Sequence, residues 1–226
     1  MFSVVLLSGG KGSRMQETTP KQYLLLGGKP MIMHSLERID QLSEVDEIIL
    51  VCDFSYVDYL TQMINEYNIT TKVVFATAGS TRQESVYNGL QKISNTDVII
   101  HEAARPFVKQ EDFQKLIDAE GENVIFGYAI PFTVLKGHEV VEDLLNRSDL
   151  INVQLPQKFK MNDLMAAYQL AIRDGKIYTE DASLLFASGN KNIKIIKGTN
   201  YNIKITEPID LLLGEIIYKN YILNRK

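Results

Sequence analysis

The sequence predicts an α/β fold built around a mostly parallel sheet. Short apolar and β-branched runs alternate along the 226 residues with longer stretches of helical spacing. Several of these runs are apolar on successive residues, which is typical of strands buried on both faces. Alternating strands and helices indicate βαβ units, and the length suits one domain over residues 1–226.

The strands are predicted from these runs, taken in chain order. They are Phe2–Leu7, Glu47–Cys52, Lys72–Ala76, Asp97–His101, Val124–Ile130 and Ile193–Lys197. The helices between and after them follow a period near 3.6 residues, as the apolar positions Leu60, Met63 and Tyr67 illustrate. They are Met31–Leu42, Tyr56–Asn68, Arg82–Ile93, Gln110–Asp118, Asn162–Asp174, Asp181–Ser188 and Pro208–Leu223.

The segment from Phe132 to Gln154 breaks the alternation. It holds short apolar runs separated by charges, with a Lys-Gly pair at Lys136–Gly137 that predicts a turn. This pattern is typical of an arm or hairpin set off from the core. Such an arm either packs against a second subunit or forms a surface hairpin, and the pattern alone leaves both open.

Composition narrows the function classes. The net charge is −4, with 24 basic and 28 acidic residues, which gives no general electrostatic reason to bind nucleic acid or an anionic membrane. The apolar runs are too short to span a bilayer, and no basic segment with a signal-peptide core is visible. A single cysteine, Cys52, excludes an intrachain disulfide and a cysteine-based zinc site. We therefore expect a cytoplasmic protein.

The loop Leu7–Met15 follows the first strand and contains three glycines, Gly9, Gly10 and Gly12. Its spacing matches neither a P-loop nor a complete dinucleotide fingerprint, in which a third glycine would stand at Met15. It does carry Lys11 and Arg14, and Lys21 follows shortly after. Glycines with these cations predict a triphosphate cradle, against the alternative of a glycine turn with solvated cations.

Three further segments carry candidate chemistry. Gly79–Val86 begins a helix with Arg82 and Ser85 in its first turn, which suits either a nucleobase or ribose site or an ordinary cap by Ser80 or Thr81. His101–Pro106 ends an apolar strand, and its Glu102 suits a divalent metal or a local pair with Arg105. Lys204 lies between two β-branched residues, and its side chain faces either solvent or a cleft.

Together these segments resemble the 2-C-methyl-D-erythritol 4-phosphate cytidylyltransferase family, which includes relatives acting on ribitol 5-phosphate. The resemblance runs from Val4 to about Leu213. Its pieces follow the family's order, namely Leu7–Met15, Pro20–Tyr23, Gly79 with Arg82 and Ser85, Ala103–Pro106, Pro156–Gln157, Thr179 with Asp181–Ser183, and Asn202–Thr206.

The resemblance implies a Rossmann-like domain, a β-arm at about 132–154 that joins a homodimer, and a Mg²⁺-dependent reaction of CTP with a polyol phosphate in isoprenoid biosynthesis. The catalytic residues it implies are Arg14, Lys21 and Lys204. The implied CTP-binding residues are Ser8, Gly9, Gly10, Gly12, Gly79, Arg82, Ser85, Ala103 and Arg105. Glu102, Thr133, Arg147 and Thr179 are the implied acceptor-binding residues, with Glu102 also the implied metal ligand.

Three positions depart from the family pattern. Glu102 stands where the family usually has aspartate, Leu155 stands where it has threonine, and Ser8 stands where it has alanine. A nucleotide-binding subunit without turnover is therefore a second hypothesis. A nicotinamide oxidoreductase is a third, which the incomplete glycine fingerprint disfavours.

Overall fold

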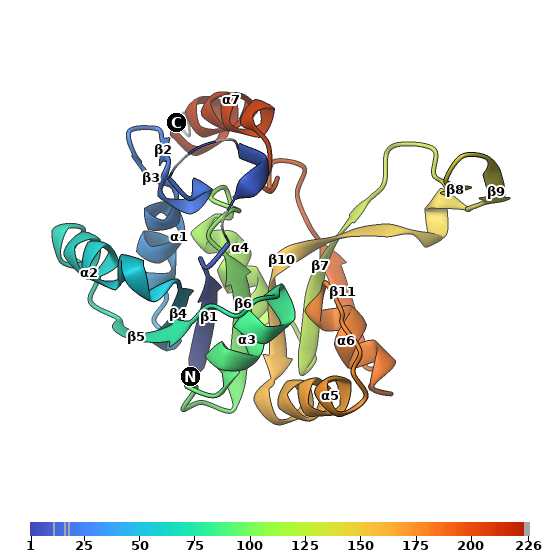
Figure 1. Ribbon diagram of the computed structural model, residues 1–226, viewed down its shortest axis with the longest axis horizontal. Helices are drawn as coiled ribbons and strands as arrows, with labels where there is room; N and C mark the ends of the chain where they lie inside the picture. Colours follow the sequence, from blue (N-terminus) through green and yellow to red (C-terminus); the bar gives the residue numbers. More distant parts are fainter. Residues whose placement is uncertain (11, 16, 18, 224–226) are drawn as a thin grey trace.

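The computed structural model describes residues 1–10, 12–15, 17 and 19–223, and it has the predicted α/β architecture. Within these residues the main sheet has seven strands in the order β11-β7-β10-β6-β1-β4-β5 (Figure 1). β10 runs antiparallel to both of its neighbours, and the other strands are parallel to one another. The strand bounds are β1 (Phe2–Leu7), β4 (Val45–Cys52), β5 (Lys72–Thr77), β6 (Asp97–Glu102), β7 (Asn123–Ala129), β10 (Ile151–Lys160) and β11 (Ile193–Lys197).

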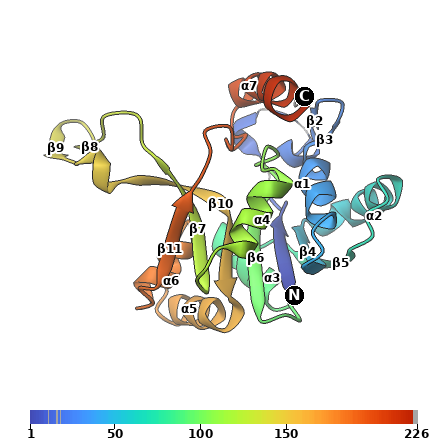
Figure 2. The ribbon, with the colours of Figure 1, turned by 180° about the vertical axis from the view of Figure 1, so that it is seen from behind.

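Helices cover both faces of this sheet, as Figures 1 and 2 show from opposite sides. One face carries α1 (Met31–Asp40), α2 (Val57–Glu66) and α4 (Gln110–Asp118), and the other carries α3 (Arg82–Leu90), α5 (Met161–Arg173) and α6 (Asp181–Ala187). Each face has its own buried apolar cluster. The burial of successive strand residues is explained by this arrangement, because both sides of each central strand meet helices.

The last helix, α7 (Pro208–Ile217), lies beyond the carboxyl end of β1 (Figure 1). A third apolar cluster of Leu26, Met31, Phe107 and Ile205 lies beneath it. The small hairpin of β2 (Leu25–Leu26) and β3 (Lys29–Pro30) supplies one of these side chains. Among the described residues, no helix has the length and apolar character needed to cross a membrane.

β10 is the one strand of the main sheet that the sequence did not predict. Pro156 stands in its middle, and proline inside a run argues against a central strand because it cannot donate a ladder hydrogen bond. The structure accommodates it at an irregularity, where the β10–β7 register shifts between Gln154 and Gln157. Pro156 predicts a break in the strand, but in the structure it lies at a bulge. That bulge is evident only from the pairing of β10 with β7.

The arm predicted at 132–154 projects from the body between β7 and β10 (Figures 1 and 2), but it ends earlier than predicted, because residues 151–154 belong to β10 and pair with β7. Its hairpin pairs β8 (Leu135–Gly137) with β9 (Val141–Leu144). The predicted turn at Lys136–Gly137 is wrong, since both residues belong to β8 and residues 138–140 make the connection. Position 137 requires glycine because the two strands of the hairpin lie very close there. A Cβ at this position would lie 2.1 Å from the carbonyl oxygen of Val140.

Candidate active site

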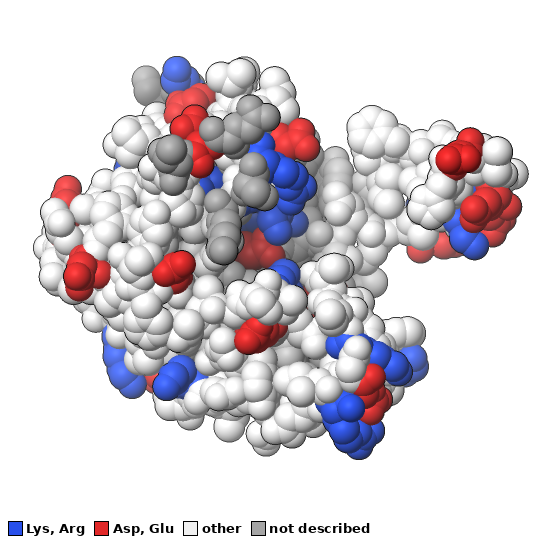
Figure 3. All heavy atoms as spheres, viewed as in Figure 1, with Lys and Arg blue, Asp and Glu red and all other residues white. Residues whose placement is uncertain are grey.

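A cavity of about 510 Å³ lies where β1 and β6 end and α3 begins; we call it the central cavity. Figure 3 shows basic side chains gathered around a hollow on this face. The predicted site residues that line it are Ser8, Gly9, Gly10, Lys21, Gly79, Arg82, Ser85, Glu102 and Lys204. They come from five separate segments of the sequence, which meet at the carboxyl ends of the strands.

The glycine loop leaves β1 with its backbone pressed against a neighbour. A Cβ on Gly9 would lie 2.2 Å from the Cβ of Ala78, so only glycine fits there. The amide of Gln22 then donates to the carbonyl oxygens of Ser8 and Gly10, at 3.1 Å for Gly10. Gln22 lies within the Pro20–Tyr23 segment of the family resemblance, and in the structure its side chain links the glycine loop to the turn that carries Lys21.

Lys21 begins the 3₁₀ turn Lys21–Tyr23 and is half-buried. Its Nζ donates to the carbonyl oxygen of Ile205 at 2.8 Å, one residue beyond Lys204. Burial and the neighbouring ammonium of Lys204 lower the pKa of Lys21. Two cationic groups thus converge on one cavity, and a polyanion bound between them would relieve their repulsion.

The start of α3 combines a cap with a binding loop. The hydroxyl of Thr81 accepts from the backbone N–H of Glu84 at 3.0 Å, so the ordinary cap is confirmed at Thr81. The backbone N–H of Gly79 donates to the hydroxyl of Ser85 at 3.0 Å. A Cβ on Gly79 would lie 2.4 Å from the Cγ of Glu84. The loop 79–81 is therefore held close to the helix end, with its backbone facing the cavity.

Glu102 lies at the end of β6 and is buried between two cations. Its Oε1 accepts from Nε of Arg82 at 2.9 Å, and its Oε2 lies 2.6 Å from Nζ of Lys204. Burial opposes its charge, but Arg82 and Lys204 outweigh this and hold the pKa of Glu102 at about 2. The ion pairs of Glu102 therefore run to distant segments rather than to Arg105, and Lys204 points to the cavity.

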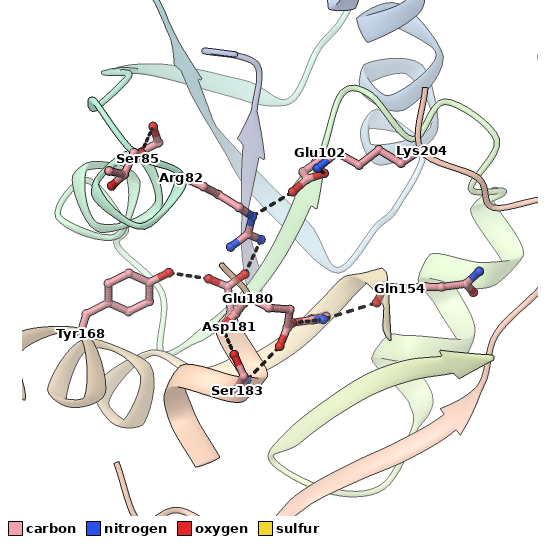
Figure 4. A network of polar contacts seen from close by, with 11 residues as sticks. Arg82, Ser85, Glu102, Gln154, Tyr168, Glu180, Asp181, Ser183 and Lys204 are labelled. Carbon is pink, nitrogen blue, oxygen red and sulfur yellow. Dashed lines mark hydrogen bonds and ion pairs between the residues drawn. The ribbon is translucent and has the colours of Figure 1, made fainter. Parts of the chain in front are cut away.

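Arg82 joins Glu102 to a second buried carboxylate (Figure 4). Its Nη2 donates to Oδ2 of Asp181 at 2.6 Å, and the hydroxyl of Tyr168 donates to the other oxygen of Asp181. Although burial opposes its charge, these two carboxylates raise the pKa of Arg82 well above its ordinary value. Asp181 belongs to a segment that carries the family resemblance but had no predicted role, and Tyr168 was not predicted as a site residue.

Other predicted residues lie near the cavity without being among the described residues that line it. Ala103 is fully buried in the apolar core, and its neighbour Ala104 lines the cavity instead. Arg105 donates to the carbonyl oxygen of Asn202 at 3.0 Å and so holds the segment that carries Lys204. Gly12 packs against Lys21, with a Cβ there 3.2 Å from the backbone nitrogen of Lys21. Arg14 is exposed in the 3₁₀ turn Ser13–Met15.

The predicted acceptor residues outside the core are also exposed. Thr179 precedes α6, and Thr133 lies in the arm. Arg147 begins the 3₁₀ turn Arg147–Asp149 of the arm, where its guanidinium donates to the carbonyl oxygen of Pro131 at 3.1 Å. These three side chains are absent from the described lining of the cavity in their own chain. Lys11 lies outside the described residues.

The carboxylates that could hold a metal are few. The described residues contain no group of three or more His, Cys, Asp or Glu side chains placed to bind an ion. Among the described residues lining the cavity, Glu102 is the only carboxylate, and both of its oxygens face cations. This donor set fits an ion that takes most of its ligands from phosphate oxygens and water.

Comparisons with known proteins show the family to which this chain belongs. Residues 2–220 match the family model described as 2-C-methyl-D-erythritol 4-phosphate cytidylyltransferase. The chain is 39% identical over 222 residues to the chloroplastic enzyme of that name from Oryza sativa subsp. japonica, covering 94% of this chain and 73% of the relative. It is also 32% identical over 232 residues to a ribitol-5-phosphate cytidylyltransferase from Vibrio parahaemolyticus, covering 96% and 95%.

A solved structure has the same fold. The 4-diphosphocytidyl-2C-methyl-D-erythritol synthase from Anaerococcus prevotii superimposes with a TM-score of 0.86 at 26% identity, covering 96% of each chain. A family match over nearly the whole chain, a shared fold and a cavity built from the family's motif residues lead to one conclusion. The chain belongs to the 2-C-methyl-D-erythritol 4-phosphate cytidylyltransferase family.

Proposed function

We propose that this protein transfers the cytidylyl group of CTP to the phosphate of a polyol, with 2-C-methyl-D-erythritol 4-phosphate as the acceptor. The observation that carries the proposal is the convergence of Lys21 and Lys204 with the glycine loop on one cavity. Family membership supports the choice of nucleotide and acceptor. Ribitol 5-phosphate is the second candidate, because a relative at 32% identity carries that name.

In the proposed reaction, a phosphate oxygen of the acceptor attacks the α-phosphorus of CTP. One phosphorus–oxygen bond forms, and the bond from that phosphorus to the bridging oxygen breaks, so pyrophosphate leaves. The attacking phosphate is already ionised at neutral pH, so the reaction needs charge neutralisation and alignment more than a strong base. Lys21 and Lys204 supply the positive charge, and the glycine loop supplies backbone N–H groups.

Mg²⁺ is the proposed divalent cation and would arrive with the triphosphate, as it does at many nucleotide sites. The chemistry it would supply is neutralisation of charge on the leaving pyrophosphate. Glu102 would hold it through coordinated water, because both carboxylate oxygens already pair with Arg82 and Lys204.

Base selectivity follows from the size and lining of the cavity. Its wall at Gly79, Ser80 and Thr81 is made of small side chains and backbone, which can read the hydrogen-bonding edge of a pyrimidine. We expect turnover with CTP to exceed turnover with ATP or GTP. Comparable rates with ATP would contradict this assignment.

The arm is proposed to complete the site of a second subunit. Arg147 is exposed in the arm, and its guanidinium fork suits the phosphate of an acceptor. Arg147→Ala should therefore raise the acceptor KM and leave CTP binding nearly unchanged. Mixing inactive Arg147→Ala with inactive Lys204→Ala should restore activity, because exchanged dimers contain one intact site. No recovery after demonstrated exchange would mean that Arg147 serves its own chain.

The experiment that tests the function measures pyrophosphate release. The purified protein is incubated with CTP, Mg²⁺ and one acceptor from a panel of methylerythritol, ribitol, ribulose and glycerol phosphates. We expect the fastest release with 2-C-methyl-D-erythritol 4-phosphate. Faster release with ribitol 5-phosphate would select the second candidate, and no release with any acceptor would favour a binding subunit without turnover.

A further inference from the structure

We propose that Asp181 is a positioning residue for Lys204, acting through Arg82 and Glu102. This inference rests on the proposed function for its effect on turnover, but the contact itself is a property of the chain. Four side chains from α3, β6, α6 and the segment before α7 form one continuous line of ion pairs. Asp181 lies at its far end from the cavity and is not among the described lining residues.

The geometry couples the two ends of this line (Figure 4). Arg82 uses Nε for Glu102 at 2.9 Å and Nη2 for Asp181 at 2.6 Å, so one guanidinium fixes both carboxylates. Glu102 then has one oxygen left for Lys204, at 2.6 Å. Glu102 is therefore available to pair with Lys204 only while Arg82 also binds Asp181.

Charge explains why Asp181 matters at this distance. Arg82 and Lys204 carry two positive charges, and the buried Glu102 and Asp181 carry two negative charges, so the charges of the line are balanced. Without the charge of Asp181, the guanidinium has a single anionic partner and would bind Glu102 through both oxygens. Glu102 would then release Lys204, and its ammonium would lose the position that it has beside the cavity.

Tyr168 fixes Asp181 from the other side. Its hydroxyl donates to Asp181 Oδ1, and the side chain of Asp181 is fully buried. Burial and the adjacent carboxylate raise the pKa of Tyr168 well above its ordinary value, so it remains a donor. A buried carboxylate held from both sides has little freedom, which is the property that a positioning residue needs.

Asp181 also stands in the first turn of α6, where a carboxylate stabilises a helix without any role in a site. A matched control separates the two roles. Asp163 stands in the first turn of α5 and accepts from Asn123 at 3.4 Å and Asn190 at 3.0 Å, away from the central cavity. Asp163→Asn removes a helix-terminal carboxylate without touching the line of ion pairs.

The test compares Asp181→Asn with Asp163→Asn in two readouts. The first is kcat and KM, where Asp181→Asn should lower kcat by about 10²-fold with CTP binding unchanged, the loss expected when a reacting group is misplaced. In a Glu102→Gln background, adding Asp181→Asn should not lower kcat further, because the ion pair between residue 102 and Lys204 is already lost. Equal losses in both backgrounds would overturn the proposal.

The second readout does not require turnover. Acetylation of lysines, followed by mass spectrometry, compares Lys204 with exposed Lys194 as an internal reference. Lys204 should be acetylated severalfold faster in Asp181→Asn than in the wild type or Asp163→Asn. An unchanged acetylation rate of Lys204 in Asp181→Asn would overturn the proposal. If that rate rises but the wild type turns over no acceptor, the positioning role of Asp181 stands and the proposed function is rejected. If Asp181→Asn fails to fold, Tyr168→Phe decides, with smaller changes expected in the same direction.

Discussion

The central cavity gathers positive charge before any anion is present. Lys21 and Lys204 both face it, and Lys204 is partly neutralised by Glu102, whereas Lys21 donates to the neutral carbonyl of Ile205. Burial lowers the pKa of Lys21, so its charge is maintained at a cost in the free protein. A bound triphosphate would stabilise the charged form of Lys21. We therefore expect the charge of Lys21 to contribute directly to triphosphate binding.

Replacing Lys21 tests this reading. Lys21→Ala should lower turnover by about 10²–10³-fold, the typical loss when one preorganised charge donor is removed. The midpoint of thermal unfolding should change little, because the lost hydrogen bond is to a single carbonyl. Steady-state pyrophosphate release measures the effect, with Lys92→Ala at an exposed position as the charge-matched control. Near-normal turnover would reject a role for Lys21 at the phosphates.

Gln22 acts on the same loop without carrying charge. Gln22→Leu keeps the volume of the buried side chain but removes its donation to Ser8 and Gly10. The glycine loop should become less ordered, and the Kd for CTP should rise by about tenfold, equivalent to a net loss of one hydrogen bond. Titration calorimetry with CTP measures it, and unchanged affinity would mean that the loop holds its shape without Gln22.

At the scale of elements, the arm differs from the central strands of the main sheet. Its apolar side chains are exposed, including Phe132 at 75%, Val140 at 72% and Leu144 at 77%. A two-stranded hairpin has little stability by itself, and exposed apolar patches mark interaction surfaces. The central strands, by contrast, bury their apolar side chains under helices on both faces of the sheet. These observations support the proposal that a second copy covers the arm.

Leu144→Asp tests that proposal directly. A charge in an apolar dimer contact is costly to bury, so the variant should sediment as a monomer at concentrations where the wild type is a dimer. Ile177→Asp is the control, since Ile177 is 73% exposed in the loop before α6. Sedimentation equilibrium gives the masses. A dimeric Leu144→Asp would exclude the arm as the contact.

At the scale of the whole molecule, acid stability depends on two buried histidines. Burial lowers the pKa of His34 to about 4, where its ring bonds to the carbonyl of Leu26. Burial and the charge of Arg105 lower the pKa of His101 to about 3. Both are unprotonated in the fold between pH 4 and about 6.5, where the unfolded chain binds protons, so stability falls as pH falls through that window.

The free energy of unfolding should therefore drop between pH 7.5 and pH 5. Each histidine contributes about 2 kcal/mol to the drop, from the protons that only the unfolded chain takes up. Urea unfolding at both pH values measures it, and His34→Gln should reduce the drop by one such increment. His138→Gln, at an exposed position in the arm, is the control. The same drop in His34→Gln and wild type would assign the acid sensitivity to other groups.

The sequence determined the parts of this protein that depend on local pattern. The bounds of β1, α4 and β11 agree with the prediction, because apolar spacing and turn residues act over a few positions. It also indicated where chemistry lies, since glycines and charges after strands meet at one edge of a parallel sheet.

Only the tertiary structure decided which charges meet. The ion-pair partners of Glu102 are Arg82 and Lys204 rather than the nearby Arg105, and Arg82 links Glu102 to Asp181. β10 lies inside the sheet despite Pro156, because its register with β7 shifts around that residue, which no local pattern indicates. Pairing between distant segments depends on how the layers pack, and that information is spread over the whole chain rather than held in any one motif.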